Sequence, residues 1–251
     1  DQELARYSRQ LNLYDLGPEG QARLRDASVL LVGLGGLGSS LALYAAAAGV
    51  GRIGLVEFDS VDPSNLNRQV LYGTSQLGRD KLDCGAARLR DLNPHIRIEA
   101  HPGAFTRDNA RQLVADYDVV ADCVDNFATR YLINDACVLE GRPLVSASIY
   151  GFEGQLTVYN HDGGPCFRCV FPEPPPAGLL PSSFEGGVMG VLPGVVGTLQ
   201  AAEVIKLVAG LGEIASGQLV HYDALAVKFS AFRVVRDTDC ALCGEQPTIV
   251  D

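Results

Sequence analysis

The segment Val32-Gly33-Leu34-Gly35-Gly36-Leu37-Gly38 decides the fold of this chain. It follows an apolar run, residues 28–32, and opens a segment of small residues, 39–48. A strand, a glycine turn and a helix in this order form the phosphate-binding unit of dinucleotide-type folds. Glu57 closes the next apolar run about twenty residues later, where a carboxylate can accept hydrogen bonds from ribose hydroxyls. The segment therefore predicts a nucleotide-binding α/β protein.

The residues after this loop indicate a triphosphate rather than a nicotinamide cofactor. Ser64-Asn65-Leu66-Asn67-Arg68-Gln69 is followed by Arg79-Asp80-Lys81. A nicotinamide has no use for such a cationic cluster beside the phosphate loop, whereas a triphosphate needs it. An NAD-dependent oxidoreductase would explain the glycine loop and Glu57 but would leave Arg68, Lys81 and Asp125 without a role. The cluster therefore favours ATP.

Strands and helices alternate along residues 28–150. Two short helices precede them, between Glu3 and Asp26, with a break at Gly17-Pro18. The alternation predicts a doubly wound, mostly parallel, Rossmann-like sheet. The predicted strands are 28–32, 53–58, 96–100, 118–122 and 144–147, and the predicted helices are 39–48, 81–92, 108–115 and 128–140.

The pattern changes after Gly151. Residues 154–159, 219–222 and 226–234 alternate with a two-residue period, which predicts antiparallel strands added to the edge of the sheet. Residues 171–183 contain five prolines and no periodicity. We expect a long mobile loop there, and such loops in compact domains are usually functional.

The composition disfavours two classes of partner. The 251 residues are 47% apolar and carry a formal net charge of −10. Nucleic acids and anionic membranes both attract basic surfaces, so we expect neither to bind this chain. A polyanionic ligand must therefore be held by a few local cations against an unfavourable overall field.

The sequence also argues against membrane insertion and export. The chain begins Asp1-Gln2-Glu3, without the basic and apolar segments of a signal peptide. The longest apolar stretch, residues 188–211, is interrupted by Pro193 and carries Glu203 and Lys206. This pattern predicts a turn and a buried helix over 195–208 rather than a membrane-spanning helix. We expect a soluble, cytoplasmic protein.

Four of the seven cysteines form two Cys-x-x-Cys pairs, Cys166 with Cys169 and Cys240 with Cys243. Each pair lies in a glycine-containing turn, and two such turns can complete a tetrahedral zinc site. Because all four ligands come from the protein, the zinc would be structural. The alternatives, a redox dithiol or disulfides, suit a reducing compartment less well. The other three cysteines are expected to be small buried residues: Cys84, Cys123 and Cys137.

These motifs together resemble the MoeB/ThiF family of ubiquitin-activating-like adenylyltransferases, and MoeB-type members most closely. The resemblance extends from Arg6-Tyr7-Ser8-Arg9-Gln10 to Cys243. It implies one adenylation domain, with N-terminal helices in 1–27, a nucleotide-binding part in 28–150 and a carrier-binding and zinc-binding part in 151–251. The motifs that carry it, in order, are the glycine loop, Ser64-Asn65-Leu66-x-Arg68-Gln69, Lys81, Asp122-Cys123-x-Asp125-Asn126 with Arg130, and both cysteine pairs.

The resemblance implies a specific reaction. The C-terminal Gly-Gly carboxylate of a ubiquitin-like sulfur-carrier protein attacks the α-phosphorus of ATP, which gives an acyl-adenylate and pyrophosphate before sulfur transfer. The carboxylate is already ionised, so no general base is needed. The difficulty is electrostatic, because an anion approaches a polyanion, and preorganised cations with Mg²⁺ answer it.

The resemblance also implies roles for individual residues. Arg9 would reach the nucleotide of a second subunit, which requires a homodimer. Asp125 would be the Mg²⁺-associated carboxylate, and Glu57 would hold the ribose, a task that Asp59 could share. Arg68 and Lys81 would act on the phosphates. The full predicted nucleotide site comprises Gly33, Gly35, Gly36, Gly38, Glu57, Asp59, Ser64, Asn65, Arg68, Lys81, Asp125 and Asn126.

Plainer interpretations of these residues remain open. Arg68, Lys81 and Arg9 are also compatible with solvated surface charges. Asp125 is also compatible with a cap of the following helix, and Arg130 with a simple ion pair to Asp125. A relative that adenylates a tRNA or a peptide, and an inactive structural partner, are the remaining functional alternatives.

The mobile loop departs from the family pattern. Ser182-Ser183 stands where related members place a cysteine, and a serine cannot form an acyl disulfide or a thioester. Adenylation survives this change, but a covalent carrier–enzyme intermediate does not. Since no rhodanese domain follows Asp251, we expect a separate protein to donate persulfide sulfur.

Overall fold

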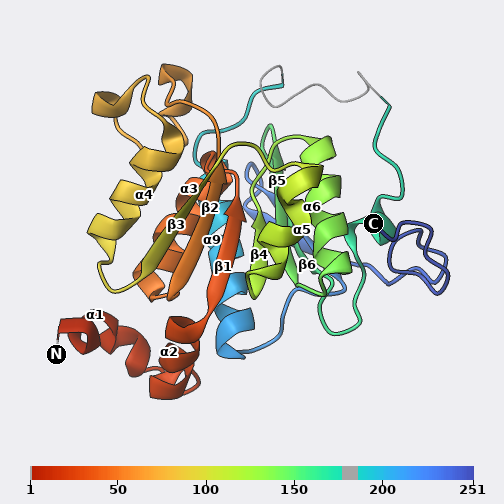
Figure 1. The fold of residues 1–251 in the computed structure, drawn as a ribbon, viewed down its shortest axis with the longest axis horizontal. Helices are drawn as coiled ribbons and strands as arrows, with labels where there is room; N and C mark the ends of the chain where they lie inside the picture. Colours follow the sequence, from red (N-terminus) through yellow and green to blue (C-terminus); the bar gives the residue numbers. More distant parts are fainter. Residues whose placement is uncertain (1, 177–185) are drawn as a thin grey trace.

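The computed structural model describes residues 2–176 and 186–251. One mixed sheet runs through the molecule, with helices on both faces (Figure 1). Its strands are β1 (Ser28–Val32), β2 (Arg52–Glu57), β3 (Arg97–Pro102), β4 (Val119–Asp122), β5 (Leu144–Tyr150), β6 (Glu153–Tyr159), β7 (Gln218–Asp223) and β8 (Lys228–Arg233). Its helices are α1 (Gln2–Leu11), α2 (Gly17–Asp26), α3 (Gly36–Ala48), α4 (Lys81–Leu92), α5 (Arg107–Ala115), α6 (Phe127–Leu139), α7 (Phe167–Val170) and α9 (Leu192–Ala209).

The strand order is β3-β2-β1-β4-β5-β6-β7-β8. Strands β1 to β5 pair in parallel, and β6, β7 and β8 continue the sheet in antiparallel pairing from β5. The predicted doubly wound sheet with antiparallel strands at one edge is thus confirmed. The chain moves from β1 to β2 on one side and later returns to β4 on the other. Ligands bind at such a switch point in open α/β sheets.

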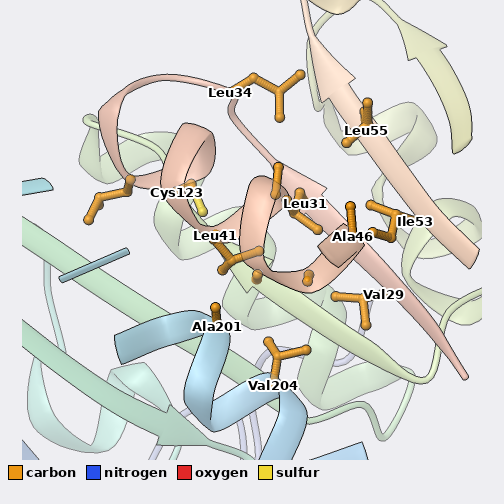
Figure 2. Packing of buried hydrophobic residues seen from close by; sticks show 14 of the residues in the cluster. Val29, Leu31, Leu34, Leu41, Ala46, Ile53, Leu55, Cys123, Ala201 and Val204 are labelled. Carbon is orange, nitrogen blue, oxygen red and sulfur yellow. The ribbon is translucent and has the colours of Figure 1, made fainter. Parts of the chain in front are cut away.

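Strand β1 is buried on both faces, as an apolar run between two helical layers must be. Val29 and Leu31 face the layer of α3, α4 and α9, and Leu30 and Val32 face the layer of α5 and α6. Figure 2 shows Leu41 of α3 pointing toward α9 within the first layer. The alternation of side chains along one strand therefore supplies both halves of the core.

Helix α9 is the one described helix that is long and apolar enough to cross a membrane, judged by length and composition. Half of its apolar window is buried inside the molecule, and Val196, Ala201 and Val204 belong to the core. It packs against α3 and the sheet like the core helix of a globular protein.

Two helices begin three residues earlier than the sequence analysis predicts. Helix α3 begins at Gly36, inside the glycine loop, rather than at residue 39. Helix α9 begins at Leu192 rather than at residue 195, because Pro193 occupies the first turn, where a helix has no use for the missing N–H. The short 3-10 turns Pro63–Asn65 and Thr74–Gln76 and helix α7 have no periodic pattern that would predict them. The predicted mobile loop, with Ser182 and Ser183, extends beyond the described residues.

Candidate active site

The glycine loop lies where β1 and β4 end side by side. Val32 pairs with Asp122, so the residues that follow each strand meet at one edge of the sheet. Gly33 has a φ of +93°, and a Cβ there would lie 3.0 Å from the carbonyl oxygen of Cys123. A Cβ on Gly38 would lie 2.1 Å from the carbonyl oxygen of Gly33. Glycine is therefore required where the loop, the first turn of α3 and the β4 end approach one another.

Glu57 binds the glycine loop of its own chain. Its Oε2 accepts a hydrogen bond from the backbone N–H of Leu34 at 2.8 Å. Its Oε1 accepts from the N–H groups of Phe58 at 2.8 Å and Asp59 at 3.0 Å. Only 7% of Glu57 is exposed, whereas the side chain of Asp59 is 55% exposed. Of these two carboxylates, Asp59 is the one presented to solvent.

Lys81 begins α4 and faces Asp59. Its Nζ lies 3.2 Å from Oδ2 of Asp59, and only 4% of the lysine is exposed. Asp80 caps the helix by accepting from the N–H of Asp83 at 3.0 Å. A buried ammonium with one exposed carboxylate as partner is a positive group held in place for an anion.

The segment after β2 brings Arg68 to the same loop. Arg68 Nη1 donates to the carbonyl oxygen of Ser64 at 2.8 Å, and its Cγ lies 3.6 Å from where a Cβ on Gly36 would be. Asp62 caps the Pro63–Asn65 turn, and hydrogen bonds from the Ser64 hydroxyl and backbone lower the pKa of Asp62. The turn thus fixes the backbone that carries Ser64 and Asn65, and with it the base of the Arg68 side chain.

Gln69 is almost fully buried beside Gly35, with 5% exposure. Its Oε1 has no hydrogen-bond partner among the described residues. A buried amide oxygen without a partner is unusual in a folded protein. Gln69 therefore places beside the glycine loop a polar atom whose hydrogen-bonding capacity is unused.

Asp125 is exposed on the loop between β4 and α6. Asn126, not Asp125, caps α6, since its Oδ1 accepts from the N–H of Thr129 at 2.9 Å. Arg130 pairs with Asp122 at 2.8 Å rather than with Asp125. Within residues 2–176 and 186–251, no side chain forms an ion pair with Asp125. Both plainer interpretations are therefore wrong: Asn126 rather than Asp125 caps α6, and Arg130 pairs with Asp122 rather than with Asp125.

A buried polar network supports the Asp125 loop from below. Asp122 accepts from Ser146 Oγ at 2.8 Å and from the N–H of Val124 at 3.1 Å, in addition to its ion pair. Gln200 of α9 donates to the carbonyl oxygen of Asp122 at 2.9 Å. Arg130 donates to two further carbonyl oxygens. The network holds the ends of β4 and β5 and the start of α6 together.

Arg9 lies away from this cluster. Helix α1 is attached at the far end of α4, where Arg6 donates to the carbonyl oxygen of Leu92 and Asn93 donates to the Tyr7 hydroxyl. Helix α4 has 12 residues and is therefore about 18 Å long. Lys81 stands at its other end, and Figure 1 shows α1 below the sheet. Of the four predicted catalytic residues, Arg9 is the one whose helix is attached at the opposite end of α4 from Lys81.

The four paired cysteines meet at one point. Their Sγ atoms all lie within 4.8 Å of one another. Three of the separations are 3.8 Å (Cys166–Cys169), 3.7 Å (Cys166–Cys240) and 3.3 Å (Cys169–Cys243). A zinc–sulfur bond of about 2.3 Å places tetrahedral sulfur atoms roughly 3.8 Å apart. The donor set therefore fits zinc.

Two of the four thiols resist ionisation. Burial, followed by the neighbouring Cys169 and Cys243 sulfur atoms, raises the pKa of Cys166, and burial, followed by the hydrogen bond with Cys169, raises the pKa of Cys243 to about 11. Burial opposes ionisation of Cys240 too, but backbone N–H groups outweigh it and lower the Cys240 pKa. A divalent ion would bind all four as thiolates. By contrast, Cys84, Cys123 and Cys137 are buried as predicted.

The cysteine cluster is attached to helix α6. Arg168, between Cys166 and Cys169, donates to both carboxylate oxygens of Asp135 at 2.8 and 2.7 Å. The guanidinium also stands 4.7 Å above the Tyr131 ring. The cysteine cluster is thereby joined to α6, the helix that begins just after Asp125.

Sequence reasoning missed three supporting residues. Tyr72 donates to the carbonyl oxygen of Leu34 at 3.0 Å, Gln200 joins β4 to α9, and Arg168 joins the cysteine cluster to α6. Their partners lie 38, 78 and 33 residues away in the sequence. The one available signal was a glutamine in the largely apolar stretch that forms α9.

Comparison with known proteins gives consistent results. The profile of the ThiF family matches residues 7–242. The chain is 57% identical over 248 residues to the adenylyltransferase and sulfurtransferase MOCS3 of Mus musculus, covering 98% of this chain and 54% of that protein. It is 51% identical over 252 residues to the sulfur carrier protein adenylyltransferase of Thermus thermophilus, covering 98% of this chain and 93% of that protein.

The chain spans about half the length of the MOCS3 relatives that it matches. Among solved structures, E. coli MccB with MccA-N7isoASN has a TM-score of 0.85 at 22% identity, covering 96% of this chain and 75% of that chain. At this identity the likeness shows the fold. The family profile and the two relatives lead to one conclusion: this chain belongs to the ThiF family.

Proposed function

We propose that the protein uses ATP to adenylate the C-terminal Gly-Gly carboxylate of a ubiquitin-like sulfur-carrier protein of the MoaD/ThiS type. The observation that carries the proposal is the arrangement around the glycine loop. The exposed carboxylate of Asp125 lies in the segment after β4, and the cationic side chains of Arg68 and Lys81 come from the segment after β2. The 51% identity to a sulfur carrier protein adenylyltransferase, over 93% of its length, supports the same activity.

In this proposal the nucleotide lies along the carboxyl edge of the sheet. The glycine loop and the first turn of α3 receive the phosphates, since backbone N–H groups at a helix start favour anions. Asn65, Arg68 and Lys81 add side-chain donors, with Ser64 and Asn126 at the rim. Glu57 and Asp59 stand at the ribose end: the Glu57 carboxylate accepts three backbone hydrogen bonds and keeps capacity for a ribose hydroxyl, and the exposed Asp59 shares the task.

The reaction needs charge stabilisation more than proton transfer. A carboxylate oxygen of the carrier forms a bond to the α-phosphorus, and the bond from the α-phosphorus to the bridging oxygen breaks, so pyrophosphate leaves with the electron pair. Arg68 and Lys81 stabilise the negative charge that spreads over the phosphates. Asp125 is an exposed oxygen ligand that fits Mg²⁺, which when bound would neutralise phosphate charge.

Two further elements complete the proposal. We place Arg9 at the nucleotide of a second subunit in a homodimer, because its own chain holds α1 at the opposite end of α4. We assign the four cysteines to a structural zinc ion. A separate protein that carries a persulfide would then supply the sulfur atom that displaces AMP from the acyl-adenylate. We expect both steps to take place in the cytoplasm.

The alternatives have less support. The alternative of a peptide substrate gains no support from the likeness to E. coli MccB, because 22% identity shows the fold alone. Hydride transfer with NAD would leave the buried ammonium of Lys81 without a purpose.

Exchange of labelled pyrophosphate into ATP tests the proposal. We expect exchange that depends on one Gly-Gly-ended carrier and stops when its last glycine is removed. Asp125→Ala should abolish it, whereas Asp108→Ala, an exposed carboxylate on α5, should leave it unchanged. Exchange that persists without any carrier, or in Asp125→Ala, would refute the proposed roles.

A further inference from the structure

Helix α1 is attached to the ends of two other helices. Arg6 Nη1 donates to the carbonyl oxygen of Leu92, the last residue of α4, at 2.7 Å. Gln10 Nε2 donates to the carbonyl oxygen of Ala48, the last residue of α3, at 3.0 Å. The last carbonyl groups of a helix have no partner within that helix. Helix α1 therefore docks by satisfying groups that the ends of α3 and α4 leave open.

Tyr7 holds the middle of α1 against the same two helix ends. Only 5% of Tyr7 is exposed, and a Cβ on Gly49, which ends α3, would lie 2.6 Å from the tyrosine Cζ. Asn93 follows the last residue of α4 and is fully buried. Its Nδ2 donates to the Tyr7 hydroxyl and to the carbonyl oxygen of Ala46, both at 2.7 Å. One buried asparagine thus joins α1 to α3 and α4 together.

Arg9 lies between these attachment points and has no partner of its own. Its side chain is exposed, and within residues 2–176 and 186–251 no hydrogen bond or ion pair engages it. Helices α3 and α4 begin at the glycine loop and at Lys81, and with 13 and 12 residues they are about 18 to 20 Å long. An arginine side chain is far shorter than either helix. Arg9 therefore does not reach the glycine loop of its own chain.

We propose that Tyr7 and Gln10 are positioning residues for Arg9, which one subunit supplies to the nucleotide site of the other. This inference rests on the proposed function and its homodimer. Isolated helices shorter than about 12 residues are marginal in water, and α1 has 10. Its attachment to α3 and α4 is therefore what makes Arg9 a preset cation rather than a mobile one.

Mixing of variants shows in which subunit Tyr7 acts. In Tyr7→Ala we expect carrier-dependent pyrophosphate exchange to fall roughly tenfold to a hundredfold, because a small misplacement of a catalytic group has such an effect. Tyr7→Ala mixed with Asp125→Ala should regain one intact site per heterodimer, whereas Tyr7→Ala mixed with Arg9→Ala should not. If Tyr7 instead acted through α4 on Lys81 of its own chain, the pattern would be reversed. Any pattern other than the expected one, once subunits have exchanged, would overturn the inference.

A double variant separates positioning from general damage. If Tyr7 acts through Arg9, adding Tyr7→Ala to Arg9→Ala should cost no further activity, whereas a merely structural effect would add to the loss. Tyr7→Phe keeps the ring against Gly49 and should stay within roughly threefold of the wild type. The matched control is Asp91→Asn, an exposed change on α4 that should leave exchange unaltered. A further loss in the double variant would overturn the inference.

Gln10→Ala repeats the mixing test in case loss of the buried ring prevents folding. It removes the hydrogen bonds to Gln21 at 2.8 Å and to Ala48, and it leaves Tyr7 in place. We expect a smaller loss of exchange than in Tyr7→Ala, with recovery on mixing with Asp125→Ala. Recovery on mixing with Arg9→Ala would overturn the inference.

Hydrogen exchange in α1 tests the attachment without any nucleotide. The α1 amides should exchange faster in Tyr7→Ala than in the wild-type protein, and Asp91→Asn should leave them unchanged. Unchanged protection of α1 in Tyr7→Ala would overturn the inference. If α1 loosens as expected but the wild-type protein shows no carrier-dependent pyrophosphate exchange, the attachment stands and the proposed function fails.

Discussion

Replacing Asp122 by asparagine should destabilise the protein strongly. Asp122 is fully buried at the end of β4 and pairs with Arg130 at 2.8 Å, Ser146 Oγ at 2.8 Å and Val124 N–H at 3.1 Å. The variant keeps one acceptor oxygen but removes the charge, so the buried guanidinium of Arg130 loses its counterion. Breaking a buried ion pair from one side costs roughly 3–5 kcal/mol, and we expect about 3 kcal/mol because Arg130 keeps two carbonyl partners.

The assay is urea unfolding of the zinc-loaded protein. With a denaturant slope of about 3 kcal/mol/M, the unfolding midpoint should fall by about 1 M. The matched control is Asp91→Asn, which breaks the exposed ion pair with Arg88 and should cost less than about 1 kcal/mol. In the double variant with Arg130→Met, part of the loss should be recovered, since no unpaired charge stays buried. Equal midpoints for Asp122→Asn and Asp91→Asn would refute the reasoning.

Four further predictions address the site and the cysteine cluster. Freshly purified protein should contain about one zinc per chain, and Cys169→Ser should lose the metal and unfold more easily, because bound zinc contributes folding free energy; metal analysis without zinc would exclude the site. Mixing inactive Arg9→Ala with inactive Asp125→Ala should restore one active site per heterodimer, and subunit exchange without recovered pyrophosphate exchange would show that Arg9 serves its own chain or solvent. Ser183→Ala should leave adenylation within roughly tenfold, or 1.4 kcal/mol of activation free energy, because a hydroxyl has no role when a carboxylate attacks phosphorus; a larger loss of rate would contradict this. Gly38→Ala should abolish ATP binding or folding, since its Cβ would lie 2.1 Å from the Gly33 carbonyl oxygen; a variant that binds ATP normally would show that the loop can shift.

The sequence was most informative where a pattern is local. The glycine loop, the apolar strands and the two cysteine pairs are each contained in a few residues, so the parallel sheet, the loop position and the four-cysteine cluster could be predicted. The change to a two-residue period after Gly151 likewise predicted the antiparallel edge formed by β6, β7 and β8.

The pairing of polar side chains could not be predicted in the same way. Glu57 ends β2 and Asp59 follows two residues later, and only the fold shows that Glu57 turns to Leu34, 23 residues earlier, while Asp59 stays exposed. Arg130 is near both Asp122 and Asp125 in sequence, and burial selects Asp122. Such choices depend on which groups the completed fold removes from water, and this is a property of the tertiary structure.

The most direct test of the central proposal follows oxygen from the carrier into AMP. A carrier protein labelled with ¹⁸O in its C-terminal carboxylate would be incubated with ATP and the protein, and hydroxylamine would then cleave the acyl-adenylate at its carbonyl carbon. Attack of the carboxylate on the α-phosphorus predicts AMP that carries one ¹⁸O, with unlabelled pyrophosphate. Unlabelled AMP, or label in inorganic phosphate, would contradict adenylation of the carrier.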